Sequence, residues 1–414
     1  MNDLEIITLG CRLNAFESEV IRETAGKAGI ENAVIVNTCA VTAEAERQAR
    51  QAIRRARRLR PDARLIVTGC AAQIAPERFA AMPEVDQVLG NLEKLDGASY
   101  AQLGARVAVQ DIMAVRATAP HLIDGFEGRA RAFVEVQQGC DHRCTFCVIP
   151  FGRGNNRSVA AGAVVEQVRT LVARGIKEVV LTGVDIASYG RDLPGAPSLG
   201  SLARRVLTLV PELPRLRLSS LDPAAIDDAL WRLIAEELRL MPHLHLSIQA
   251  GDDLILKRMK RRHSRAEAIE VARRARAFRP DIVLGADMIA GFPTEDEAMA
   301  ERSLSFVEEA GLDLLHVFPF SPRAGTPAAR MPQVPRATIR ARAATLRRIA
   351  AERKRAAFGR FIGETVNALV EQMALGRSEH YLPVRVHESA GEGEIRRVRI
   401  VGADETSLIA EDAR

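Results

Sequence analysis

Three cysteines stand close together directly after a strand-like segment, and no other feature of this chain constrains its fold as tightly. Cys140, Cys144 and Cys147 form a C-x3-C-x2-C loop behind the β-rich run 133–138. From Phe133 onwards, β-rich runs alternate with helical spacers, which is typical of parallel strands joined by crossover helices. The loop is therefore predicted to lie at the carboxyl end of a parallel strand, where such folds place their ligands.

The middle block, 126–356, is predicted to form a partial (β/α)6 barrel of the TIM type. Six β-rich runs separated by helical spacers support this prediction, and an active site is expected at the carboxyl ends of the strands. The runs are FVEVQQ (133–138), EVVLTG (178–183), RLRLSS (215–220), HLHLSIQ (243–249), DIVLGADMI (281–289) and LLHVFPFS (314–321).

The first block, 1–105, also alternates and predicts a small doubly wound parallel sheet, giving an α/β fold overall. Its first three β-rich runs end on Cys11, Cys39 and Cys70. Because parallel strands share one carboxyl edge, the three thiols should converge in a crevice there. Inert core cysteines would instead stand within the strands. We expect a second three-thiolate metal site with one coordination position open.

Composition narrows the class of protein. With 414 residues, 47% hydrophobic and 27% charged, the chain is neither disordered nor a disulfide scaffold. No secretory signal and no membrane-spanning run is evident, so a cytoplasmic protein without a membrane partner is expected. In that reducing compartment the six cysteines are more plausible as metal ligands than as disulfides.

Irregular residues 106–130 predict a linker, and the last block, 358–414, predicts a small β-barrel. Between the barrels, 336–360 is a basic helix with nine arginines and lysines against the single acid Glu352. Basic runs also occupy 47–60 and 257–265. Such faces suit a polyanion such as nucleic acid, although an arginine-rich face can also be merely solvated.

The Cys140 loop predicts a particular chemistry. Three thiolates can hold three irons of a 4Fe-4S cube and leave the fourth iron free. A free iron beside a barrel mouth can chelate S-adenosylmethionine, whose reductive cleavage gives a 5′-deoxyadenosyl radical. The alternative is a Cys3His zinc site with His142, but a histidine between the first two cysteines makes a shared tetrahedron awkward.

These two cysteine sets and the three-block order resemble the radical S-adenosylmethionine methylthiotransferases over essentially the whole chain. The resemblance implies an auxiliary 4Fe-4S cluster on Cys11, Cys39 and Cys70, a radical core, and an RNA-binding β-barrel called TRAM. It also implies that one S-adenosylmethionine methylates a sulfur carried on the auxiliary cluster, while another makes the radical. An external electron donor of the flavodoxin or ferredoxin type is expected, and the sulfur source stays open.

The resemblance extends to residues around S-adenosylmethionine. Phe146 matches an aromatic whose backbone faces the adenine, although it could simply pack beneath the cluster. LTGVD keeps only the middle glycine of the Gly-Gly-Glu that grips the methionine amino group in many radical enzymes. Polar strand ends and the segment GADMIAGFP complete the set. The candidates are Phe146, Thr182, Gly183, Asp185, Ser219, Gln249, Ile289 and Gly291.

Local phrases indicate the substrate. IPFGRG, SSLDP, HLHLSIQAGDDLILKRMKRRH and HVFPFSPRAGTPAARMPQV resemble the group that adds a methylthio group to C2 of N6-threonylcarbamoyladenosine at position 37 of tRNA. The other groups act on isopentenyladenosine in tRNA or on a ribosomal-protein aspartate. The threonylcarbamoyl carboxylate suits cationic side chains. The candidate substrate-binding residues are Arg261, Arg262 and Arg323 for this carboxylate, and Arg153 and Arg157 for a substrate phosphate or the methionine carboxylate.

A protein of another class is also considered, namely a non-catalytic iron-sulfur regulator that binds RNA and senses oxidation through its clusters. Both proteins would carry the same cysteines and basic faces. Release of 5′-deoxyadenosine on reduction separates them, because only the enzyme cleaves S-adenosylmethionine.

Overall fold

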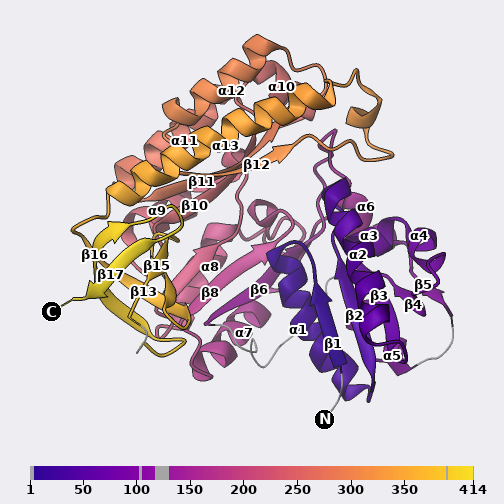
Figure 1. Ribbon diagram of the computed structural model, residues 1–414. Helices are drawn as coiled ribbons and strands as arrows, with labels where there is room; N and C mark the ends of the chain where they lie inside the picture. The colour runs from indigo at the N-terminus through magenta and orange to yellow at the C-terminus, as the bar shows by residue number, and fades with distance from the viewer. Residues whose placement is uncertain (1–3, 102–104, 117–129, 388–389, 414) are drawn as a thin grey trace.

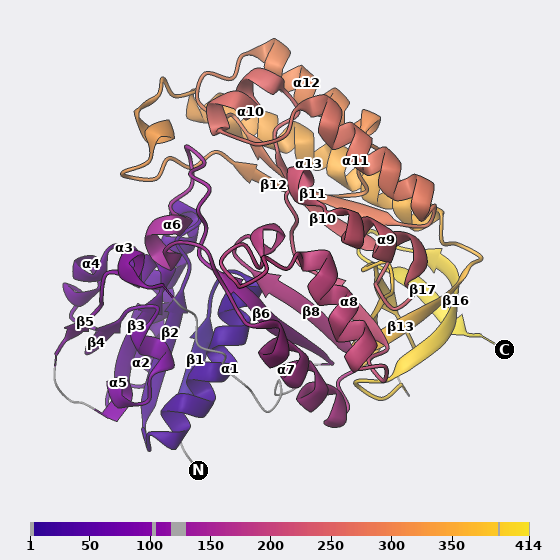
Figure 2. The same cartoon turned by 180° about the vertical axis from the view of Figure 1, so that it is seen from behind.

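The computed structural model of the protein describes residues 4–101, 105–116, 130–387 and 390–413. Three β-structures follow one another along the chain: a parallel N-terminal sheet, an open barrel and a small closed C-terminal barrel (Figures 1 and 2). Part of the predicted linker 106–130 lies outside the described residues.

The N-terminal sheet has five parallel strands in chain order. They are β1 (Leu4–Thr8), β2 (Ala33–Thr38), β3 (Arg64–Gly69), β4 (Gln87–Leu89) and β5 (Val107–Ala108), of which β5 lies beyond the predicted end of the block at 105. The helices are α1 (Arg12–Lys27), α2 (Ala43–Leu59), α3 (Cys70–Ile74), α4 (Pro76–Ala80) and α5 (Ala98–Ala101), with 3-10 turns η1 (Glu93–Leu95) and η2 (Ile112–Ala114).

Helices cover both faces of this parallel sheet, as in the predicted doubly wound sheet, but its strands follow one another in chain order. Ile21 of α1 packs with Ile35 on one face, whereas Ile53 of α2 packs with Val36 on the other. A doubly wound sheet reverses its strand order where the helices change face. Here the order runs β1 to β5 without reversal. Alternation along the sequence reports the elements and not the order of the strands.

The open barrel contains the six parallel strands that were predicted. Isolated bridges join its halves between β9 and β10, and a short antiparallel strand borders β6. The strands are β6 (Arg131–Gln138), β8 (Glu178–Gly183), β9 (Arg215–Leu218), β10 (His243–Gln249), β11 (Val283–Ala290) and β12 (Leu314–Pro319), with β7 (Arg157–Ser158) at the border. The helices are α6 (Ile149–Arg153), α7 (Ala161–Ala173), α8 (Leu199–Leu209), α9 (Asp228–Glu236), α10 (Asp253–Met259), α11 (Arg265–Phe278) and α12 (Glu297–Glu309), with 3-10 turns η3 (Ile186–Ser188), η4 (Pro223–Ala225) and η5 (Pro327–Arg330).

Helix α1 belongs to two cores and joins the N-terminal sheet to the barrel. Its residues Leu13, Phe16 and Val20 are buried in the barrel core, while Ile21 faces the sheet. Each such side chain contributes about 1.5–3 kcal/mol through burial. The shared helix therefore fixes the carboxyl edge of the sheet against β6.

The basic helix α13 (Arg336–Gly359) lies along β11 and β12, as Figure 1 shows, and leads into the C-terminal barrel. That barrel closes in the order β13-β14-β15-β17-β16, which confirms the predicted small β-barrel. Its strands are β13 (Thr365–Gln372), β14 (Leu375–Ser378), β15 (Pro383–Arg385), β16 (Ile395–Ala403) and β17 (Leu408–Asp412). Among the described helices, none is both long and apolar enough to cross a lipid bilayer.

Candidate active site

The cysteine loop of the barrel follows β6 at its carboxyl end and is fastened on both sides. The amide of Cys140 donates to the carbonyl of Gly154 at 3.0 Å. Thr145 donates from its amide to the carbonyl of Met259 at 3.1 Å and from its hydroxyl to the carbonyl of Arg258 at 2.8 Å. The barrel trio, Cys140, Cys144 and Cys147, is thus held between β6 and the end of α10.

The environment of the barrel trio keeps its thiols neutral until a metal binds. Burial raises the pKa of Cys147 to about 12, and burial together with the nearby Asp185 raises the pKa of Cys140 to about 12. Arg261 lies 3.6 Å from the sulfur of Cys144. Because a coordinated metal deprotonates a thiol outright, these positions suit metal ligands rather than free nucleophiles.

The second set, the sheet trio of Cys11, Cys39 and Cys70, lies at the carboxyl edge of β1, β2 and β3, where the sequence placed it. Gly10 has a φ of 98°, and a Cβ there would stand 2.8 Å from the sulfur of Cys39. Only glycine allows this approach between the two loops. Burial raises the pKa of Cys39 to about 12.

Each trio offers three thiolates. Three thiolates suit three corners of a 4Fe-4S cube and leave the fourth iron free. Among the described residues, His142 belongs to no group of three close metal-ligand atoms, so no histidine completes a Cys3His zinc set at the barrel trio.

One short helix connects the two trios. Helix α6 begins just after Cys147 and packs against α3, which begins with Cys70 (Figures 1 and 2). A Cβ on Gly152 would lie 3.2 Å from that of Cys70, and the side chain of Asn91 donates to the carbonyl of Gly152 at 2.5 Å. The last residue of α6, Arg153, donates from Nε to the sulfur of Cys70 at 2.9 Å. The trios therefore face one another across this helix.

Arg153 is buried in a charged network with Glu17 and Lys94, which are also buried. Nη2 of Arg153 donates to Glu17 at 2.8 Å, and Nζ of Lys94 donates to Glu17 at 2.7 Å. Burial would raise the pKa of Glu17, but the two cations outweigh it and lower that pKa to about 2. Two cations against one anion leave a net positive charge beside Cys70, which favours a bound anionic cluster.

Sequence reasoning missed Glu17 and Lys94. Asn14, Glu17 and Ser18 form a polar stripe on α1 that is typical of a solvent-facing surface. In the fold this stripe is buried at the junction of sheet and barrel. The one indication of this burial in the sequence is that α1 carries apolar residues on both of its faces.

Glu135, on β6, adds a pH-dependent element to this junction. Burial, and then the negative charge of Glu17, raise its pKa from 4.5 to about 8. The folded protein therefore keeps a proton that the unfolded chain releases above pH 4.5. Stability supplied by this group is present at low pH and is lost as the pH rises towards 8.

Glu135→Gln is expected to flatten that loss. Between about pH 4.5 and pH 8, titration of Glu135 lowers the free energy of unfolding of the native protein by up to about 1.4 kcal/mol per pH unit. The variant should match the native protein near pH 5 and exceed it at pH 8 in urea unfolding. Glu31→Gln, at an exposed position, serves as control. Parallel pH profiles for native protein and Glu135→Gln would contradict the assignment.

The candidate S-adenosylmethionine residues gather at the carboxyl edge of the barrel. Thr182, Gly183 and Asp185 end β8 or follow it, and the amide of Asp185 donates to Gln137 at 2.8 Å. The carboxylate of Asp185 lies 3.9 Å from the sulfur of Cys140. The ends of β9, β10 and β11 place the other polar and apolar candidates on the same edge, namely Ser219, Gln249, Ile289 and Gly291. Phe146 packs edge-on against Phe292 with ring centroids 6.4 Å apart.

Two predicted substrate-binding arginines are placed elsewhere by the fold. Arg153 is engaged with Glu17 and Cys70, and Arg157 donates to the carbonyls of Arg153 and Asn155, both at 2.9 Å. Both side chains are buried. Contrary to the prediction, neither is accessible to a substrate, because their guanidinium groups serve internal hydrogen bonds.

The other three arginines differ in exposure. Arg261 and Arg262 share Asp222, at 3.3 and 2.9 Å, whereas Arg323 pairs with Glu46 of α2. Their side chains are 7%, 26% and 10% exposed, respectively. Burial would raise the pKa of Asp222, but the nearby His263, 3.7 Å away, and the two arginines outweigh it and lower that pKa. Arg262 is the best placed of the three to meet a ligand.

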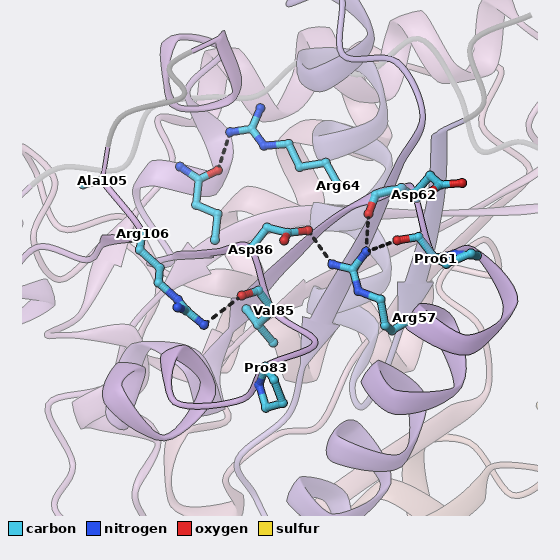
Figure 3. Close-up of a pocket in the computed structure, with 11 residues that line it drawn as sticks. Arg57, Pro61, Asp62, Arg64, Pro83, Val85, Asp86, Ala105 and Arg106 are labelled. Atoms are coloured by element: carbon cyan, nitrogen blue, oxygen red, sulfur yellow. Dashed lines mark hydrogen bonds and ion pairs between the residues drawn. The ribbon is translucent and has the colours of Figure 1, made fainter.

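A surface hollow of about 670 Å³ lies far from this chemistry, at the amino ends of β3, β4 and β5 (Figure 3). Arg57 donates there to Asp86 and to the carbonyl of Pro61, and Arg106 donates to the carbonyl of Val85. These contacts stabilise the turns around the hollow. It holds none of the cysteines.

Comparison with known proteins agrees with this arrangement. Residues 134–307 match the Radical SAM superfamily, and residues 3–90 match a family described as Uncharacterized protein family UPF0004. The chain is 51% identical to the threonylcarbamoyladenosine tRNA methylthiotransferase MtaB of Rickettsia prowazekii, over 97% of this chain and 95% of that protein. It is 35% identical to a tRNA-2-methylthio-N(6)-dimethylallyladenosine synthase of Cereibacter sphaeroides, over 99% and 98% of the two chains.

Among solved structures, the radical S-adenosylmethionine methyltransferase TsrM of Kitasatospora setae aligns with a TM-score of 0.55 at 17% identity, covering 79% of this chain and 75% of that one. At this identity the likeness concerns the fold alone. The near full-length relatives, the matching N-terminal and radical segments and the two cysteine trios together show that the chain belongs to the radical S-adenosylmethionine methylthiotransferase family.

Proposed function

We propose that this enzyme adds a methylthio group to C2 of N6-threonylcarbamoyladenosine at position 37 of tRNA. The observation that carries the proposal is 51% identity, over 97% of the chain, to a protein named for threonylcarbamoyladenosine tRNA methylthiotransfer. The relative named for dimethylallyladenosine is 35% identical over a similar share. The two facing trios support a transfer that needs two reactive centres.

Each trio holds one 4Fe-4S cluster in this proposal. Cys140, Cys144 and Cys147 would hold the cluster, which when bound would supply the electron for cleavage of S-adenosylmethionine. The chain orients that molecule at the barrel edge through the candidate residues described above. The sheet trio stands across α6 and would hold the second cluster, which would carry the sulfur to be transferred.

Arg262 receives the carboxylate of the threonylcarbamoyl group. Its side chain is more exposed than those of Arg261 and Arg323. Its guanidinium lies 2.9 Å from Asp222 and 3.6 Å from Asp185, and these two carboxylates hold it near the barrel trio. Guanidinium and carboxylate form charge-assisted hydrogen bonds. A dimethylallyl group offers no such charge.

The proposed domains are a sheet domain at 1–105, which β5 (Val107–Ala108) extends, a radical core at 126–356 and a TRAM-like barrel at 358–414. Exposed basic residues on α13 and on β16 contact the tRNA backbone. They include Arg336, Arg340 and Arg355 on the helix and Arg397 and Arg399 on the strand. The enzyme acts in the cytoplasm and takes electrons from a flavodoxin or ferredoxin type of donor.

Nucleoside mass spectrometry tests the proposal. Cells lacking the protein should lose the methylthio group from threonylcarbamoyladenosine alone, and loss from isopentenyladenosine instead would overturn the substrate. With reconstituted enzyme, Arg262→Ala should lower conversion of the carboxylated tRNA at least about 10-fold, since a charged hydrogen bond contributes about 1.5–3 kcal/mol. Cleavage of S-adenosylmethionine without tRNA should persist. Equal loss of both would remove Arg262 from substrate binding.

A further inference from the structure

Three neighbouring strands of the barrel bring two imidazoles and a carboxylate together away from the cysteines. His245 on β10, Asp287 on β11 and His316 on β12 each offer one ligand atom, and these atoms lie within 4.8 Å of one another. Nε2 of His245 is 2.9 Å from Oδ1 of Asp287, and Nδ1 of His316 is 3.3 Å from the same oxygen. The ring centroids of His245 and His316 are 4.8 Å apart.

This His-Asp-His set faces the inside of the barrel. The alternate residues Leu246, Ala286 and Val317 pack in the core on the helix side of the same strands. Successive side chains of a strand point to opposite faces, so the set lies on the inner face. The side chains of His245, Asp287 and His316 are 7%, 21% and 62% exposed. The set is therefore anchored at β10 and open to solvent at β12.

The sequence is adapted to this placement at Gly285. A Cβ at that position would stand 2.7 Å from Nδ1 of His245, so the imidazole lies where only a glycine leaves room. Glycine within a strand often marks such a close approach. With Nδ1 against Gly285, Nε2 of His245 is directed at Asp287.

We propose that His245, Asp287 and His316 hold a divalent transition-metal ion inside the barrel. Two histidines and one carboxylate suit zinc or iron(II) and leave coordination positions open. Those positions face the barrel interior, where a water or an oxygen ligand of a substrate can occupy them. Along β11 the site lies two residues, or about 7 Å, before Ile289. It uses no cysteine and rests on the barrel geometry, independently of the proposed tRNA substrate.

Zinc binding by the cluster-loaded enzyme tests this site. The holoenzyme is dialysed against a chelator and titrated with Zn²⁺, and zinc and iron per chain are measured by mass spectrometry. One zinc per chain is expected without loss of iron. X-ray absorption at the zinc edge should show nitrogen and oxygen ligands at about 2.0–2.1 Å and no sulfur at about 2.3 Å, because the cysteines are occupied.

Variants identify the ligands. His316→Ala and Asp287→Asn should weaken zinc binding at least about 100-fold, and Gly285→Ala should weaken it by displacing His245. His380→Ala is the matched control, because His380 pairs with Asp281 at 2.7 Å and, among the described residues, belongs to no group of three metal-ligand atoms. His316 is exposed, so its variant is expected to fold and to keep its iron. The proposal is overturned if zinc is not retained, if its ligands are sulfur, or if His316→Ala binds zinc like the native protein.

Discussion

Cys147→Ala is expected to abolish 5′-deoxyadenosine release and methylthio transfer together, whereas Cys70→Ala should abolish the transfer and spare the release. Each affected activity should fall at least about 10³-fold, or about 4 kcal/mol in barrier height. The difference follows from geometry, because Cys147 belongs to the trio at the barrel edge and Cys70 to the trio across α6. Product analysis with and without tRNA measures the two activities separately.

Iron content provides a second readout for these variants. Each should lose about four of about eight irons per chain, since each trio holds one 4Fe-4S cluster in the proposed function. Phe151→Ala is the local control, because this exposed residue lies on α6 between the trios and ligates nothing. Loss of 5′-deoxyadenosine release in Cys70→Ala, with the barrel cluster still loaded, would show that the two centres do not act separately.

The edge where both trios lie could be predicted from the sequence because it follows from local patterns and one topological rule. Alternating runs locate parallel strands, and parallel strands end at a common edge. Residues that directly follow such strands, such as Cys39 and Cys140, are thereby brought to that edge without knowledge of any long-range contact. The same argument located the six barrel strands with only small shifts at their ends.

What the pattern could not provide is pairing between distant positions. The order of strands in the N-terminal sheet depends on which face each helix covers. An order that follows the chain and an order that reverses have the same alternation of strands and helices along the sequence. Strand β14 cannot be located from the sequence pattern, because LGRS is short and has no β-rich alternation. The His-Asp-His set stayed hidden because its members lie within three strands, where the register between the strands, and not a shared edge, decides which side chains meet.

Arg153 is a second case in which the sequence pattern does not reveal a pairing between distant residues. Charged residues are rarely buried unless they are paired, so an arginine after a cysteine loop is most simply interpreted as a surface cation. Its partner Glu17 is 136 residues away, on a helix whose polar stripe looks solvated. Only the packing of α1 between sheet and barrel brings the two together.

Arg153→Met is expected to lower the free energy of unfolding by about 3–5 kcal/mol, because it leaves Glu17 buried with a single cation. Adding Glu17→Gln should recover part of that loss, since the uncompensated carboxylate is removed. Urea unfolding of native protein, both single variants and the double variant gives the coupling energy between the two positions. Arg55→Met, at an exposed site on α2, should change stability by no more than about 0.5 kcal/mol.

The same substitution should also act on the sheet cluster, because Arg153 contributes the guanidinium that lies 2.9 Å from the sulfur of Cys70. Removing this positive charge and hydrogen-bond donor destabilises the more negative, reduced state of the cluster. The midpoint potential of that cluster, followed by electron paramagnetic resonance, should therefore fall in Arg153→Met, while the barrel cluster changes less. A coupling energy near zero together with unchanged potentials would mean that Arg153 only fills space between the trios.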